Sequence, residues 1–211
     1  MRQNPVKPPP EAPVTLLGGA IALQGRHAST VVMRLLLMAG FALLFLPLPD
    51  LDHQVMWLLH HRSVVTHSVL PALLLALLGG RLGAAPVAGG LIGISVHLAC
   101  DALSPPIGYG QVWWPAPWKV GFGGWSQYWL LGNAALSYLM AVSIAPFLFP
   151  KGWGVPLVVV LSGGLGAWYG IANEGALTST LMATTMPLAT AVIWFLQRRR
   201  HRAALRRKAH P

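Results

Sequence analysis

Charged residues are scarce in this chain, and acidic residues are the scarcest of them. Of its 211 residues, 9% are charged and 55% are hydrophobic, with 5 Asp+Glu against 15 Lys+Arg. Soluble domains carry about 25% charged residues, so the composition excludes an ordinary soluble globule, and its apolar content excludes a disordered chain. Because a carboxylate near a bilayer is costly and usually functional, each acid is informative. The five acids are Glu11, Asp50, Asp52, Asp101 and Glu174.

Cysteine is nearly absent, since Cys100 stands alone, and this excludes a disulfide within the chain. The formal net charge of +10 would suggest nucleic acid in a soluble protein. Seven of the basic residues fall in the last fourteen positions, however, so the charge marks a tail and not a stripe on a domain. We therefore expect no nucleic-acid partner.

Long apolar runs are what the sequence has in abundance. A membrane-spanning helix needs about 20 mainly apolar residues, and six segments approach that length. They are residues 31–48, 65–82, 85–103, 127–149, 154–172 and 178–197. The second is short and ends in glycines, which allows a tilted or partly inserted segment. The pattern predicts an all-α, polytopic helical membrane protein with about six spans (five to six).

This pattern divides the chain into three parts. Residues 1–30 form a disordered or weakly apolar N-terminal segment, residues 31–197 a single transmembrane helical domain, and residues 198–211 a basic tail. Cytoplasmic loops are the richer in Lys and Arg, so the tail is predicted to be cytoplasmic. An even number of spans then places the central histidines and four of the five acids at the outer membrane face.

A first polar cluster follows the first span. Pro47 and Pro49 end that helix, and Asp50 and Asp52 come next. In an extended chain residues i and i+2 point to one side, so we expect the two carboxylates to face the same point. Two carboxylates that close repel each other unless a cation or a shared proton holds them. The alternative is a solvated turn at a helix end.

A second cluster, HHRSVVTHS, occupies residues 60–68. Imidazole suits zinc, and carboxylate suits manganese or magnesium. Arg62 can bind a phosphate or carboxylate with a bidentate fork, while Thr66 and Ser68 can cap a helix or orient a ligand. The alternative is a set of interfacial histidines with an arginine that reaches the lipid headgroups. We favour that alternative for His53 and His60.

A third cluster places His97 and Asp101 four residues apart on a strongly apolar helix. Residues at this spacing share one face, about 5–6 Å apart at Cβ, so the pair can bind a metal ion. The alternative is a structural hydrogen bond between the two side chains. An ionised Asp within a span needs a partner, and a metal is a suitable one. Cys100 points away from Asp101, and we interpret it as a packing residue.

Together the clusters supply mixed nitrogen and oxygen ligands for one or two divalent ions, with open positions for water and substrate. Zinc is the first expectation, and manganese or magnesium are the alternatives. The predicted ligands are Asp50, Asp52, His61, His67, His97 and Asp101. Catalytic roles are predicted for Asp52, Arg62 and His67, with Thr66 and Ser68 supporting the ligands.

Tryptophan is concentrated between residues 104 and 129. The five are Trp113, Trp114, Trp118, Trp125 and Trp129. They suit an aromatic belt at a membrane interface or a lid that guides a lipid-like substrate. Lys119 could add a phosphate contact, and Glu174 could be a helix cap or an extra acid group; the sequence leaves these roles open.

Four ordered elements carry a resemblance to a known family. They are LPDLDH (48–53), HRSVVTHS (61–68), SVHLACDALSP (95–105) and GQVWWPAP (110–117). This set resembles the YdjM-type membrane-bound metal-dependent hydrolases, described as LexA-binding and associated with the bacterial inner membrane. The resemblance covers about residues 47–118. It implies divalent-metal-dependent hydrolysis and, through a distant kinship with zinc-dependent phospholipase C and P1-type nucleases, a phosphoester substrate.

The resemblance transfers functional roles to eight positions, and two features depart from the family pattern. The eight positions are Asp50, Asp52, His61, Arg62, Thr66, His67, His97 and Asp101. Ser63 replaces a glycine of the family, and the family's early Thr-His or Gly-His is missing, with His27 its only counterpart. A ligand is therefore absent or replaced, with Glu174 as a candidate replacement.

The sequence thus predicts a membrane hydrolase that cleaves a phosphoester of a lipid or lipid-linked substrate. Membrane lipids and a small or lipid-like phosphoester are the expected partners. One alternative is a divalent-metal transporter or sensor, although the fourth and sixth spans lack ionisable residues in their interiors. The other is a catalytically inactive membrane scaffold whose basic tail binds anionic lipid.

Overall fold

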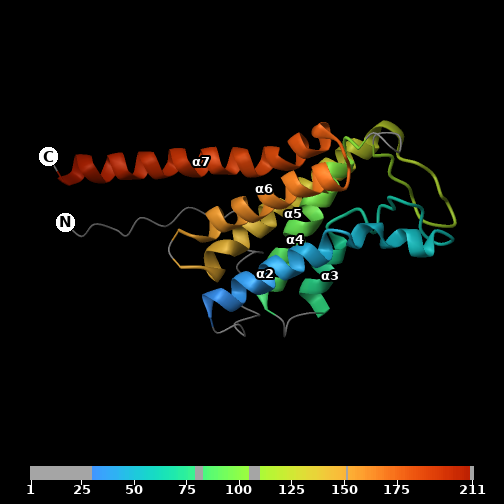
Figure 1. Ribbon diagram of the computed structural model, residues 1–211, viewed down its shortest axis with the longest axis horizontal. Coiled ribbons are helices and arrows are strands. Elements are labelled where there is room, and N and C mark those ends of the chain that lie inside the picture. Colours follow the sequence, from blue (N-terminus) through green and yellow to red (C-terminus); the bar gives the residue numbers. More distant parts are fainter. Residues whose placement is uncertain (1–29, 79–82, 105–109, 151, 210–211) are drawn as a thin grey trace, which may run out of the picture.

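The computed structural model describes residues 30–78, 83–104, 110–150 and 152–209 (Figure 1). In these ranges the regular elements are helical, and the β pairing consists of two isolated bridges at Trp113. The helices are α2 (Val31–Phe45), η1 (Leu48–Val55), α3 (Leu70–Leu78), α4 (Ala84–Asp101), η2 (Gly123–Trp125), α5 (Ser126–Leu148), α6 (Gly154–Ala172) and α7 (Leu177–Ala209). The all-α prediction is confirmed. The predicted disorder at residues 1–30 lies almost wholly outside the described residues.

Five helices of the described chain are long and apolar enough to cross a membrane, as a multi-pass membrane protein requires. The second predicted segment, residues 65–82, contains only the nine-residue helix α3 in its described part, which fits the short or partly inserted segment that the sequence also allowed. At 1.5 Å per residue α3 is about 14 Å long, about half of a hydrocarbon core. Figure 1 nevertheless shows α2 beginning and α7 ending at the same end of the bundle.

Helix α4 is the centre of the bundle, and all 18 of its residues are buried. The other long helices and α3 pack around it. Two glycines on α4 allow the closest approach: a Cβ atom at Gly89 would collide with the carbonyl of Met38, and one at Gly93 with the carbonyl of Ala42. Small residues four apart are typical of close helix packing in membranes. This packing holds α2 and α4 parallel, with their C-terminal ends at the same end of the bundle.

Helix α7 is longer than predicted. The predicted span ended at residue 197, whereas the helix continues through the basic segment to Ala209 and extends past the bundle in Figure 1. Arginine, lysine, alanine and leucine are all good helix formers, so the tail prolongs the helix that precedes it. Exposed apolar side chains such as Val160, Ile171 and Leu188 lie on the outer surface of α6 and α7, where a membrane would cover them.

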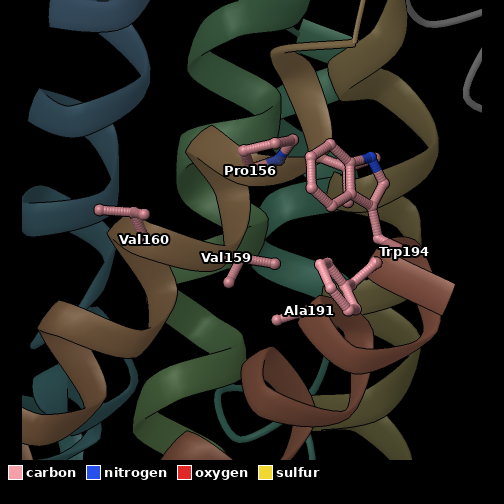
Figure 2. Close-up of a pocket in the computed structure, with 7 residues that line it drawn as sticks. Pro156, Val159, Val160, Ala191 and Trp194 are labelled. Carbon is pink, nitrogen blue, oxygen red and sulfur yellow. The ribbon is translucent and has the colours of Figure 1, made fainter. Parts of the chain in front are cut away.

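An apolar pocket of about 310 Å³ lies between α6 and α7 (Figure 2). Pro156 and Val159 of α6 face Ala191 and Trp194 of α7 across it. Pro156 precedes Tyr169 by thirteen residues of α6, which is about 20 Å along a helix. This pocket is therefore remote from the polar residues at the other end of the bundle, which Tyr169 contacts.

Candidate metal centre

Helix η1 determines where the first pair of carboxylates points. The prediction of an extended chain after Pro49 is wrong, because residues Leu48–Val55 form a 3₁₀ helix with proline in its first turn. The fixed φ of proline suits the first turn of a helix as well as an extended chain. A 3₁₀ helix has three residues per turn, so residues i and i+2 diverge and residues i and i+3 eclipse. Asp50 and Asp52 consequently face different surroundings.

Asp52 is fully buried and accepts from groups of the 61–67 segment. Its Oδ2 accepts from the backbone N–H of Ser63 (3.2 Å) and the hydroxyl of Thr66 (2.9 Å). Nδ1 of His61 lies 3.3 Å from Oδ1, and Nδ1 of His67 lies 3.3 Å from Oδ2. A carboxylate at Nδ1 fixes the ring and the tautomer of a metal-binding histidine. The structure thus places Asp52 behind two of the predicted ligands.

Asp50, His67 and His97 converge at the end of α4. Each offers a ligand atom, and these atoms all lie within 4.8 Å of one another, so the group can hold a metal ion. The Nε2 atoms of the two histidines are 3.4 Å apart, and Oδ1 of Asp50 lies 3.9 Å from that of His67 and 3.6 Å from that of His97. Imidazole nitrogen with carboxylate oxygen is a donor set for zinc and related divalent ions.

Asp101 lies beside this group. Its Oδ2 is 3.1 Å from Nε2 of His67 and 3.4 Å from Nε2 of His97, so it approaches the same two nitrogens as Asp50. Both oxygens of Asp101 also accept from the guanidinium of Arg62, at 3.1 and 3.2 Å. The fork predicted for Arg62 therefore binds a carboxylate of this chain. Arg62 is buried and has a φ of 57°.

The rings of His67 and His97 each have a hydrogen-bonding partner at Nδ1, the nitrogen that faces away from the metal group. The hydroxyl of Tyr169 on α6 lies 3.0 Å from Nδ1 of His97, and the Thr66 hydroxyl lies 3.1 Å from Nδ1 of His67. Burial disfavours a charged His67, but hydrogen bonds to Asp101 and Asp52 outweigh burial and raise the pKa of His67 above 6.5. The indole of Trp129 donates to the backbone carbonyl of His67 at 2.8 Å. Both rings are therefore oriented before a ligand arrives.

Other predicted residues have different positions. Ser68 caps α3, because its hydroxyl accepts from the N–H of Leu70 at 3.2 Å. Glu174 accepts from the hydroxyl of Ser104 at 2.6 Å and belongs to neither metal group found among the described residues. Cys100 is buried in the core, which confirms its interpretation as a packing residue.

The tryptophan-rich segment is joined to the site by its backbone. The N–H of Trp113 donates to the carbonyl of Arg62 at 3.0 Å, and its carbonyl accepts from Val64 at 2.9 Å. The ring of Trp113 stacks on His60 with centroids 4.3 Å apart. Trp118 and Trp125 are exposed, as a membrane-interface belt requires. Lys119 donates to the carbonyl of Met56 at 3.2 Å.

The sequence interpretation missed His53 and Tyr169. His53 forms a second group with Asp50 and His61, whose ligand atoms also lie within 4.8 Å of one another. His53 follows Asp50 by three residues, and residues three apart lie on the same side of a 3₁₀ helix. A prediction of a 3₁₀ helix here would therefore have placed His53 beside Asp50. Tyr169 lies 72 residues from His97 in the chain, and no local pattern links them.

Comparisons with known proteins give no relative for this chain: no family model, curated protein or solved structure matches it.

Proposed function

We propose that this protein is a membrane-bound, metal-dependent hydrolase that cleaves a phosphoester of a lipid or lipid-linked substrate. The observation that supports this most is the convergence of Asp50, His67 and His97, with both histidine rings held from behind. Preorganised ligands with supporting hydrogen bonds are what a metal site requires. The resemblance of residues 47–118 to YdjM-type hydrolases points to the same chemistry.

In this proposal His67, His97 and Asp50 hold a divalent ion, with zinc as the first expectation and manganese or magnesium as alternatives. The bound ion supplies Lewis-acid chemistry, which polarises a phosphoryl oxygen and makes water a better nucleophile near neutral pH. Asp50 is about a third exposed (36%), so water and substrate can reach the ion that it would hold. Asp52 acts through the histidines that it orients, because its oxygens already accept several hydrogen bonds.

Arg62 has an indirect part in this proposal. Its guanidinium is committed to Asp101, so it fixes that carboxylate beside the Nε2 atoms of His67 and His97. This makes Arg62 a positioning residue, whereas direct binding of phosphate would require the ion pair to open. Asp101 is either a further ligand or the carboxylate that keeps the two imidazoles in place.

An apolar groove beside the site supports a lipid as substrate. It measures about 320 Å³, and its lining residues are Leu43, Leu46, Pro47, Trp168, Tyr169, Ala172 and Asn173. Tyr169 joins the groove to the site, because its hydroxyl contacts His97. An acyl chain in this groove would place a phosphate headgroup at the end of α4. Binding pockets of this kind are mostly apolar with a few polar groups that fix orientation.

We further propose that the protein resides in the bacterial inner membrane, with the C-terminus in the cytoplasm and the site at the outer face. The basic residues beyond residue 197 support this orientation, since cytoplasmic segments are enriched in arginine and lysine. Helices α2 and α4 both end at the metal centre, while α7 ends at the opposite end of the bundle. The site and the basic segment would therefore face opposite sides of the membrane.

The test is a hydrolysis assay on the purified full chain in detergent. The protein is stripped with a chelator, reloaded with zinc, manganese or magnesium, and given a panel of phospholipids and soluble phosphodiesters. We expect metal-dependent cleavage that falls roughly 100-fold or more in His97→Ala. His60→Ala is the matched control, because His60 stacks on Trp113 outside the group. Equal rates for His97→Ala and the parent, or activity without metal, would overturn the proposal.

A further inference from the structure

We propose a second cation position formed by Asp50, His53 and His61, adjacent to the first and sharing Asp50 with it. The site would then be a dinuclear centre for divalent cations that accept nitrogen and oxygen ligands, such as Mn²⁺ or Zn²⁺. This inference rests on the metal centre of the proposed function and adds a second cation position to it. His53, for which the sequence favoured the role of an interfacial histidine, becomes a ligand.

The side chains of Asp50, His53 and His61 converge. Their ligand atoms lie within 4.8 Å of one another, the same closeness that defines the buried group. The 3₁₀ geometry of η1 explains why Asp50 and His53 align, since residues three apart eclipse in such a helix. The rings of His53 and His61 stack with centroids 4.0 Å apart. Two imidazoles from separate segments thus meet beside one carboxylate.

The two groups of candidate ligands have Asp50 in common. Among the described residues Asp50 belongs to both groups, while His67 and His97 belong to one and His53 and His61 to the other. A carboxylate has two oxygens and can bridge two cations. In catalytic two-metal sites the ions lie about 3.5–4 Å apart. A shared aspartate is therefore the arrangement expected of a dinuclear centre.

Asp52 supports one histidine of each cation position. Its Oδ1 lies 3.3 Å from Nδ1 of His61, and its Oδ2 lies 3.3 Å from Nδ1 of His67. One buried carboxylate thereby orients a ligand of each cation. This arrangement gives a physical reason for an acidic side chain with no exposure at the end of the first span, where an ionised group is otherwise costly.

The two positions differ in access. His67 and His97 are buried, whereas His61 is partly exposed and His53 is exposed. The second position is therefore open to water and substrate, and its ion should bind more weakly and exchange faster. Open coordination positions are characteristic of catalytic ions. We expect the buried ion to bind first and the open one second.

The experiment counts metal ions in the full chain. Protein purified in detergent is stripped with a chelator and dialysed to equilibrium against buffer that contains Mn²⁺ or Zn²⁺. Bound metal is the excess inside the dialysis bag over the outer buffer, divided by the protein concentration. We expect two ions per chain in the parent and one in His53→Ala. His60→Ala is the control and should keep two, because His60 is in neither group. A single ion in the parent, or two in His53→Ala, would overturn the proposal.

A spectroscopic readout tests the shared aspartate. Two Mn²⁺ ions at bridging distance are magnetically coupled, so the Mn²⁺-loaded parent should give a coupled electron paramagnetic resonance spectrum. His53→Ala should give the spectrum of an isolated Mn²⁺ ion, and His60→Ala that of the parent. Two uncoupled ions in the parent would contradict sharing of Asp50. Because His53 is exposed, loss of the fold is not expected to explain the change.

The count and the hydrolysis assay separate the two proposals. Two coupled ions without cleavage of any phosphoester would refute the hydrolase function and support the dinuclear site. Metal-dependent cleavage with one ion per chain would support the function and refute the second position.

Discussion

The guanidinium of Arg62 donates to both carboxylate oxygens of Asp101, from Nε to Oδ2 at 3.1 Å and from Nη2 to Oδ1 at 3.2 Å. Both side chains are buried, and 39 residues separate them in the chain. The pair fastens the loop after η1 to the last turn of α4. Since Oδ2 of Asp101 also lies 3.1 Å from Nε2 of His67, the same ion pair positions a candidate ligand.

Removing the cation should destabilise the metal-free protein. Arg62→Met leaves the buried carboxylate of Asp101 without its charged partner, which costs about 3–5 kcal/mol in the free energy of unfolding. The measurement is unfolding in detergent with a chelator present. The double variant Arg62→Met/Asp101→Leu removes both charges and should regain most of the loss. A single variant as stable as the parent, or a double variant no better than the single, contradicts this account.

The hydroxyl of Tyr169 should matter for metal affinity. Tyr169→Phe removes the group 3.0 Å from Nδ1 of His97 and keeps the ring. Loss of such a supporting contact typically lowers metal affinity about 10–100-fold. Competition with a chromogenic zinc chelator measures the change. Tyr128→Phe is the control, because Tyr128 is exposed beside Trp125. Unchanged affinity in Tyr169→Phe would show that this hydroxyl does not orient the ligand.

Zinc affinity should depend on pH through His67. Burial opposes its charged form, yet the hydrogen bonds of Asp101 and Asp52 raise its pKa above 6.5, with Asp50 and His97 facing the same ring. Because the metal must displace the proton, affinity should fall about tenfold per pH unit below the raised pKa and level off above it. Zinc titrations at a series of pH values measure this, and His60→Ala should keep the slope. Affinity that does not change with pH would contradict it.

Substitution of the α4 glycines that contact the α2 backbone should destabilise the protein. In Gly93→Ala the new Cβ collides with the backbone of Ala42, and the forced separation should cost about 1–3 kcal/mol in stability. Gly40→Ala on α2 is the matched control, because its Cβ meets open space and alanine favours a helix more than glycine. Thermal unfolding in detergent compares them. Equal melting temperatures for the two variants would rule out the close contact.

The long helices could be predicted because apolar run length is a direct requirement of a membrane span. Residues 154–172 were predicted and α6 occupies Gly154–Ala172. Within residues 65–82 the described helix α3 begins only at Leu70, because Thr66, His67 and Ser68 interrupt the apolar run. There the hydroxyl of Thr66 contacts Asp52, and that of Ser68 caps α3 in place of extending a helix.

The candidate site was predictable in its residue types and less so in its geometry. His97 and Asp101 lie on one helix, where a spacing of four fixes their relation, and both lie at the site. The backbone conformation after Pro49 could not be predicted from the sequence, because proline suits both extended and helical backbone. The positions of Asp52 and His53 relative to Asp50 depend on that conformation. Tyr169 lies on α6, far from the site residues in the sequence. The only sequence signal for its contact with His97 is that a buried tyrosine hydroxyl needs a hydrogen-bond partner.

Anomalous diffraction from zinc-loaded crystals would locate the ion that His67, His97 and Asp50 are proposed to hold. We predict a zinc peak at about 2.0–2.1 Å from Nε2 of both His67 and His97, with Asp50 also bound. The peak should be absent in His97→Ala and present in His60→Ala. Absence of a peak between these two imidazoles in the zinc-saturated parent protein would refute the proposed metal centre.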